Sequence, residues 1–120
     1  HAQDYVQLIG FVKDTELIDH YLLADVFVMP SNKEGFGIVF IEAMACGRKV
    51  IAGNKDGSVD ALKHGVLGQL VDPDDKAELM AAIEHSLEQS LETPLLLQEK
   101  VVDAFGFHRY KEHLKKALGF

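Results

Sequence analysis

The sequence predicts an α/β domain in which a parallel sheet is flanked by helices. Short apolar or β-branched runs alternate along the chain with segments of helical periodicity, which is the pattern of βαβ units. Several of these runs are almost entirely apolar, as is typical of strands covered on both faces of a sheet. The chain has 120 residues and is 48% hydrophobic, so it is long enough for one domain with its own core.

The first strand and the first helix are predicted at residues 5–12 and 14–24. The stretch YVQLIGFV (5–12) is rich in β-branched and aromatic residues, which favours a strand. The stretch 14–24 has apolar residues at helical spacing, and Asp14 or Thr15 can cap its start. The residues at that spacing are Leu17, Ile18, Tyr21 and Leu22.

The next segment predicts a strand, a loop, a helix and a second strand. ADVFVMP (24–30) is a nearly continuous apolar run stopped by a proline, so we expect a strand buried on both faces. SNKEGF (31–36) predicts a loop. IVFIEAMAC (38–46) predicts a helix closed by Gly47, and KVIAG (49–53) predicts another buried strand.

The second half of the chain continues the alternation. Its predicted elements are a loop at 54–58, a helix at 58–64, a strand at 66–71, a turn at 72–75 and helices at 76–91, 94–104 and 107–118. Ser58 is expected to cap the first of these helices. The helix at 76–91 has a clear apolar stripe, which indicates one face against the sheet. That stripe consists of Leu79, Met80, Ile83 and Leu87.

A ligand site is expected at the carboxyl edge of this sheet. In open α/β sheets ligands bind beyond the carboxyl ends of the strands. Three predicted loops lie there, at 11–14, 31–37 and 54–58. The middle loop holds the most informative residues, two glycines and a glutamate, and leads directly into a helix.

Gly35 and Gly37 flank Phe36 just before that helix. Glycines remove the Cβ atoms that would hold a ligand away from the backbone. The first amides of a helix have no intrahelical partners and carry partial positive charge. The segment therefore suits an anion, most simply a phosphate, with a plain loop-to-helix turn as the alternative.

Glu42 is a carboxylate in a helix with almost no polar face. We expect that helix to be covered by protein nearly all round, so Glu42 must be hydrogen-bonded, paired or face a cleft. Glu34 lies near the same loop end, eight positions earlier. Each carboxylate can accept two hydrogen bonds from the vicinal hydroxyls of a sugar. The alternative is a buried ion pair of Glu42 with Arg48 or Lys49.

Two carboxylates beside an anion site suit a ligand with hydroxyls at both ends and a diphosphate between them, which is the layout of a nucleotide sugar. The stretch PSNKEGFGIVFIEAMACGRKVIA resembles the signature of the C-terminal, donor-binding domain of family 4 (group 1) retaining glycosyltransferases. The resemblance rests on two glutamates separated by seven residues within this context and extends over residues 5–92. It implies a Rossmann-like domain, a truncated C-terminal half of the GT-B fold.

The resemblance implies a role for each matching residue. Glu34 is the catalytic-site carboxylate, at the donor sugar near its anomeric centre. The implied contacts are the amides of Gly35, Phe36 and Gly37 with the sugar, those of Ile38 and Val39 with the diphosphate, Glu42 with the ribose, and Phe11, Val12 and Lys13 near the base. No cofactor and no metal ion are implied, because the nucleotide sugar is a substrate and the family's transfer step is metal-independent.

The sequence departs from the family in two ways. Where the family has Gly-Gly and then a glutamate, this chain has Asp56, Gly57 and Asp60. The upstream arginine and lysine of the diphosphate site and the N-terminal acceptor domain are also missing from residues 1–120. We therefore expect one domain, incomplete at its N-terminus and inactive alone as a transferase. In the strand order 3-2-1-4-5-6 of the family, its first strand would leave a gap in the sheet or pair elsewhere.

The resemblance also implies partners and a location. The partners are a nucleotide-diphosphate sugar and a sugar or lipid-linked acceptor, the latter held by the missing domain. The parent protein is expected in the cytoplasm, with attachment to the inner membrane face left open. The basic stretch HRYKEHLKK at the C-terminal end could meet a membrane surface, but a solvated helix face is favoured.

Composition argues against other classes of function. The net charge is −7 and no basic run is interleaved with aromatic residues, so nucleic-acid binding is disfavoured. The single cysteine, Cys46, excludes an internal disulfide and is expected to be a small buried apolar residue. The histidines lack metal-ligand spacing. Two alternatives stay open: another GT-B-like enzyme, such as a nucleotide-sugar epimerase or a phosphorylase, and a non-catalytic doubly wound binding domain.

Overall fold

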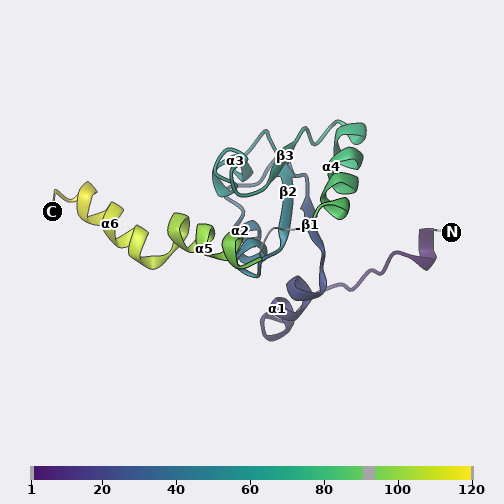
Figure 1. The fold of residues 1–120 in the computed structure, drawn as a ribbon, viewed down its shortest axis with the longest axis horizontal. Coiled ribbons are helices and arrows are strands. Elements are labelled where there is room, and N and C mark those ends of the chain that lie inside the picture. The colour runs from purple at the N-terminus through teal and green to yellow at the C-terminus, as the bar shows by residue number, and fades with distance from the viewer. Residues whose placement is uncertain (1, 91–93, 120) are drawn as a thin grey trace.

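The computed structural model describes residues 2–90 and 94–119, and its centre is a three-stranded parallel sheet. The strands β1 (Val26–Met29), β2 (Lys49–Gly53) and β3 (Gln69–Val71) lie in the order β1-β2-β3 (Figure 1). In register, Val28 lies opposite Ile51, and Ile51 lies opposite Gln69. The predicted α/β class with a parallel sheet is confirmed.

Helices surround the sheet and extend beyond it. They are the 3₁₀ turn η1 (Ala2–Asp4) and the α-helices α1 (Asp14–Leu23), α2 (Ile38–Ala45), α3 (Ser58–Ala61), α4 (Lys76–Glu88), α5 (Pro94–Phe105) and α6 (Phe107–Ala117). α2 and α3 pack on one face of the sheet with α5 against α2, and α4 covers the other face. α6 continues outward from α5, so the molecule is long in one direction, at 60 × 32 × 30 Å.

The alternation of side chains along β2 divides the core between the two faces. Val50 and Ala52 point into the larger cluster, beneath α2 and α3, whose most buried members include Phe40 and Met44. Ile51 points to the opposite face. There it packs with Val71 of β3 and Ala82 of α4. The central strand is therefore covered on both faces, as its continuous apolar run predicted.

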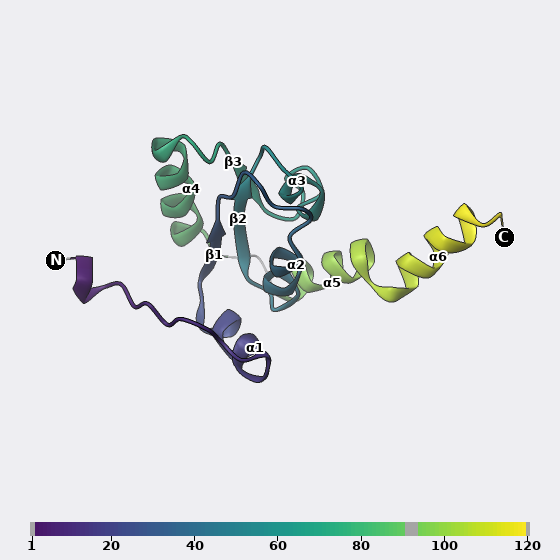
Figure 2. The same ribbon diagram turned by 180° about the vertical axis from the view of Figure 1, so that it is seen from behind.

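The predicted first strand, residues 5–12, does not form. The segment runs away from the sheet as an extended, unpaired chain toward the N-terminus (Figures 1 and 2). Its apolar side chains are exposed except for the half-buried Val12, with Leu8 at 96% and Phe11 at 92%. β-branched composition favours a strand only where a neighbouring strand supplies hydrogen bonds and cover. The chain neither holds an interrupted sheet nor pairs this segment elsewhere within the described residues.

Several boundaries also differ from the predictions. β1 is an edge strand, and all four of its residues are half-buried, so the expectation of burial on both faces is wrong for it. α3 ends at Ala61 because Lys63 and His64 have left-handed φ angles of 49° and 55°. β3 begins only at Gln69.

The predicted helix caps are also partly wrong. Lys13 is the N-cap of α1 and offers no side-chain hydrogen bond, so neither Asp14 nor Thr15 caps it. Gly57 is the N-cap of α3, which puts Ser58 in the first turn of the helix. A cap that the sequence analysis did not predict is Asp75, at the end of the turn at 72–75, which caps α4 by accepting a hydrogen bond from the N–H of Glu78 at 3.0 Å.

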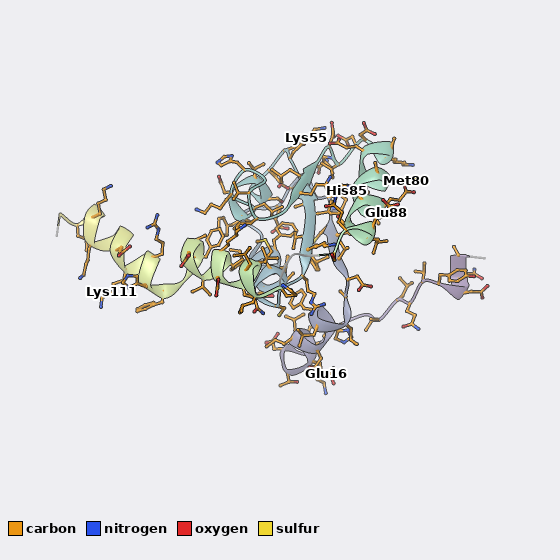
Figure 3. All side chains as sticks on the ribbon, viewed as in Figure 1. Glu16, Lys55, Met80, His85, Glu88 and Lys111 are labelled. Atoms are coloured by element: carbon orange, nitrogen blue, oxygen red, sulfur yellow. The ribbon has the colours of Figure 1, made fainter. Side chains whose placement is uncertain are left out.

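The buried face of α4 is rotated from the predicted stripe. Ala82 and Ser86 are buried and Leu79 and Ile83 are half-buried, whereas Leu87 is exposed. Met80 is 61% exposed and lies on the outer side of the helix (Figure 3). The buried residues of α4 at its contact with the sheet are small, which lets the helix approach the sheet closely. Within residues 2–90 and 94–119, no helix is long and apolar enough to cross a membrane.

Replacing Ile51 by alanine tests the central position of β2. The side chain is fully buried between β3 and α4, so truncation leaves a cavity. We expect the free energy of unfolding to fall by about 2–5 kcal/mol, measured by urea denaturation. Leu8→Ala, at a 96% exposed position, is the control and should change stability by less than about 0.5 kcal/mol. Equal losses in the two variants would show that residues 5–12 are packed in solution.

Candidate functional site

Two loops meet at the carboxyl edge of the sheet, one after β1 and one after β2. Lys55, in the second loop, marks this edge in Figure 3. The N–H of Glu34 donates to Oδ2 of Asp56 at 2.6 Å, and the N–H of Gly57 donates to the carbonyl oxygen of Glu34 at 3.0 Å. Both backbone polar groups of Glu34 are thus held by the neighbouring loop, which fixes where its side chain begins.

Two glycines allow this close approach of the loops. A Cβ atom on Gly57 would lie 1.6 Å from the carbonyl oxygen of Gly35, and one on Gly53 would lie 2.0 Å from that of Ser31. No side chain can occupy either place without moving backbone. The contact between the loops is therefore main chain on main chain, and it depends on the residues after β2 as much as on the Glu34 loop.

Gly37 turns the first loop into α2. It is the N-cap in the left-handed region, with φ 83°, and a Cβ atom there would meet the Phe40 ring at 2.4 Å. No side chain caps this helix end. The amides of Ile38 and Val39 at the first turn are therefore available to an external acceptor, as the anion-site hypothesis requires.

Glu42 lies one turn further, on the outward face of α2. Ile38 and Ala45 on that face are exposed, whereas Phe40 and Met44 face the core. The expectation that α2 is covered nearly all round is therefore wrong, because Ile38 and Ala45, at the two ends of this face, are exposed. Glu42 itself is half-buried.

The partner of Glu42 is a tyrosine. The hydroxyl of Tyr21 on α1 donates to Oε2 of Glu42 at 2.9 Å. Arg48 instead donates to the carbonyl oxygens of Cys46 and Ala24, at 3.3 and 3.2 Å. The alternative of an ion pair between Glu42 and a neighbouring cation is thus not realised.

Lys49, the other candidate cation, is also engaged elsewhere. It donates to the carbonyl oxygens of Ser86 and Gln89 at the end of α4. A cation there is favourable, because the last carbonyls of a helix lack intrahelical partners and carry partial negative charge. The charge of Glu42 is left without a protein cation among the described residues.

The electrostatics of the site follow from these contacts. Burial raises the pKa of Tyr21, and the hydrogen bond and charge of Glu42 raise it further, so Tyr21 is a neutral donor. Desolvation also raises the pKa of Asp56, but donors from Ser58 and the N–H of Glu34 outweigh it and hold that pKa below its ordinary value. Asp56 is thus charged whenever the two loops are joined at ordinary pH.

The remaining predicted residues divide into two groups. Phe36 is 42% exposed, and its ring meets Phe105 of α5 edge-on at 5.9 Å, so α5 supports the glycine loop from outside the sheet. Phe11, Val12 and Lys13 follow no strand, so the loop at 11–14 does not lie at a strand's carboxyl end. Their proximity to a base stays a prediction.

Sequence reasoning missed three contributors to this site. Tyr21 has the helical spacing of an ordinary core residue. Phe105 has the character of an aromatic residue that only packs the last helices together. Asp56 stood out only as a departure at a glycine position. An isolated tyrosine signals a hydroxyl that needs a partner once its ring is buried, but the sequence does not say which acceptor it meets. Among residues 2–90 and 94–119, no three acidic, histidine or cysteine side chains cluster as metal ligands.

One cavity lies at the other edge of the sheet. It has a volume of about 320 Å³ and is lined by residues that include Lys49 and Gln69, where β2 and β3 begin. Because ligands of parallel sheets bind at the carboxyl ends of the strands, the surface around Glu34 and Glu42 is the better candidate.

A family model described as "Glycosyl transferases group 1" matches residues 1–101. The chain is 48% identical over 67 residues to the D-inositol 3-phosphate glycosyltransferase of Geodermatophilus obscurus, which covers 56% of this chain and 15% of that protein. It is 45% identical over 76 residues to the GDP-mannose-dependent alpha-(1-6)-phosphatidylinositol monomannoside mannosyltransferase of Mycobacterium tuberculosis, covering 58% and 20%. The chain therefore spans a fifth or less of these relatives.

A solved structure has the same architecture. Anabaena HepE in complex with UDP superimposes on 98% of this chain with a TM-score of 0.79 and 26% identity. The match covers 33% of the HepE chain. The complex of HepE with UDP and glucose gives a TM-score of 0.76 at 27% identity, over 95% of this chain and 32% of HepE.

Gly57→Ala tests the contact between the loops. The added methyl would collide with the carbonyl oxygen of Gly35, so the loops must separate. We expect a loss of about 1–3 kcal/mol in the free energy of unfolding, measured by urea denaturation. Gly35→Ala is the matched control, because its Cβ meets no atom within 4 Å and should cost less than about 0.5 kcal/mol. A Gly57→Ala variant as stable as the wild type would contradict the main-chain contact.

The lowered pKa of Asp56 predicts a pH dependence of stability. Its ordinary value is 3.8, and the folded value is lower. The stabilisation is therefore complete above that ordinary value and is lost as the pH falls through the lower folded value. Between about pH 5 and about pH 3, unfolding free energy should fall more steeply for the wild type than for Asp56→Asn.

The matched control for this pH series is Asp103→Asn, at an exposed position on α5. That variant should keep the wild-type slope. Parallel curves for the wild type and Asp56→Asn would mean that the Asp56 carboxylate does not hold the Glu34 loop.

Proposed function

The chain belongs to the group 1 glycosyl transferases, and on that premise we propose that its carboxyl-edge surface binds a nucleotide-sugar donor for glycosyl transfer. The domain keeps the Rossmann-like GT-B architecture expected for this family. The proposal rests mainly on one observation: α2 has an uncapped N-terminus with a carboxylate on each side of it, Glu34 before the helix and Glu42 one turn inside.

Each part of this arrangement suits one part of the donor. The free amides of Ile38 and Val39 would hold the diphosphate, since they carry the partial positive charge of the helix end. Glu42 would accept hydrogen bonds from the ribose hydroxyls. Glu34, with the amides of residues 35–37, would lie at the sugar near its anomeric carbon. The diphosphate is also the leaving group, so the same amides would stabilise the charge that develops on it during transfer.

Names of similar proteins support this ligand class without fixing the base. HepE was solved with UDP, and the mycobacterial relative is GDP-mannose-dependent. The residues expected near the base, 11–13, are the part of the candidate site that the sheet does not position.

The chemical step itself would need more than this chain. We propose transfer with retention of anomeric configuration, without a metal ion or cofactor, in a longer protein whose other domain holds a sugar or lipid-linked acceptor. In that protein the open surface over Glu34 and Glu42 would face the second domain. By itself the 120-residue chain should bind a donor weakly and transfer no sugar.

Calorimetric titration with UDP, GDP, ADP and their glucose or mannose conjugates tests the proposal. We expect one base to bind and Glu42→Gln to weaken that nucleotide at least about tenfold, as for loss of a hydrogen bond to a charged group. Glu34→Gln should weaken the sugar conjugate but leave the free nucleotide nearly unchanged. Glu84→Gln, at an exposed position on α4, is the control.

The outcomes separate the alternatives. Binding that depends on Glu42 and on the nucleotide supports the donor site. No binding of any nucleotide to the wild-type chain, or binding that is indifferent to Glu42, overturns the proposed site and favours a non-catalytic domain.

A further inference from the structure

Tyr21 is the one residue of α1 that is buried. The side chain is 5% exposed, and its hydroxyl meets Oε2 of Glu42 at 2.9 Å, across 21 positions of sequence. A buried phenol could have been satisfied by a backbone carbonyl, which would leave the glutamate free to move. The hydroxyl instead lies on the carboxylate of the candidate ribose site.

The ring of Tyr21 has little freedom to turn. It packs edge-on against Phe27 of β1, with centroids 5.7 Å apart and planes at 62°. Phe27 in turn packs edge-on against the fully buried Phe40 of α2, at 6.0 Å and 75°. This row of rings joins α1, β1 and α2. The direction of the Tyr21 hydroxyl is therefore fixed by the same core that fixes α2.

The protons of this pair have one arrangement. The pKa of Tyr21 is raised, first by burial and then by Glu42, so the phenol keeps its proton and donates. Glu42 is the acceptor through Oε2. No other hydrogen bond holds this carboxylate among the described residues, so Oε1 keeps its capacity to accept. It does so on the outward face of α2, beside the exposed Ile38.

We propose that Tyr21 is a positioning residue for nucleotide binding: it clamps one oxygen of Glu42 so that the carboxylate stands ready to accept from the ribose diol of the donor. This inference rests on the proposed function. Without the clamp a glutamate on an open helix face would sample several rotamers, and each nucleotide would have to order it on binding. With the clamp that ordering is already complete.

A purely structural role for Tyr21 predicts different behaviour. As an anchor of α1 it would contribute through its ring, and loss of the hydroxyl would affect all ligands equally. As a positioning residue it acts through the hydroxyl and only on ligands with ribose hydroxyls. Tyr21→Phe separates the two, because it keeps the ring contacts with Phe27.

The first measurement compares nucleotides with and without the two ribose hydroxyls. We expect Tyr21→Phe to weaken the ribonucleotide that the wild type binds by about three- to tenfold, as for one hydrogen bond. The matching 2′,3′-dideoxynucleotide, which offers Glu42 no ribose hydroxyl, should bind the variant and the wild type nearly alike. Tyr5→Phe, at a position 88% exposed, is the control and should match the wild type with both ligands. Equal weakening of both ligands, or of neither, overturns the proposal.

The second measurement needs no ligand. Urea denaturation of Tyr21→Phe, Glu42→Gln and the double variant forms a double-mutant cycle. We expect the two changes to be non-additive, because they remove the same contact. Additive effects would overturn the clamp even if nucleotides bind.

Together the two measurements separate this inference from the proposed function. If no nucleotide binds the wild type and the cycle is still non-additive, the proposed function is wrong. The ribose role of the pair would fall with it, and the Tyr21–Glu42 contact would be structural only.

Discussion

The hydrogen bond from the N–H of Glu34 to the Asp56 carboxylate is the contact on which the candidate site depends. It joins loops that are 22 positions apart in sequence and that end neighbouring parallel strands. Gly57 completes it by donating to the carbonyl oxygen of Glu34, which only a residue without Cβ can do at this distance. Because α2 begins at Ile38, directly after the turn at Gly37, the same contact also sets where the free amides of the helix point.

α2 serves the fold and the site with opposite faces. Phe40, Ala43 and Met44 are fully buried against the sheet and secure the helix, while on the opposite face Ile38 and Ala45 are exposed and Glu42 is half-buried. A carboxylate on such a face would normally be mobile. Here the aromatic row from Phe40 through Phe27 places the Tyr21 hydroxyl against the Glu42 carboxylate. The core that holds the helix therefore also holds this side chain.

The N-terminal segment shows the opposite case, in which sequence character has no tertiary partner. Residues 5–12 have a strand-like composition, yet they do not pair with the edge strand β1, and most of their apolar side chains are exposed. Strand-like composition forms a strand only where a neighbouring strand supplies hydrogen bonds and cover, and residues 5–12 run away from the sheet.

The sequence by itself determined the α/β class, the parallel strands at 26–29 and 49–53, and the Glu34–Glu42 segment. Each of these follows from a local signal: hydrophobic periodicity, the placement of glycines, or a carboxylate side chain in an apolar helix. Only the tertiary structure decided what those residues meet. Asp56 took the N–H of Glu34, Tyr21 took Glu42 in place of Arg48 or Lys49, and residues 5–12 stayed outside the sheet. Each of these outcomes depends on which donor, acceptor or strand edge lies within a few ångströms after folding, and spacing along the chain does not encode that distance.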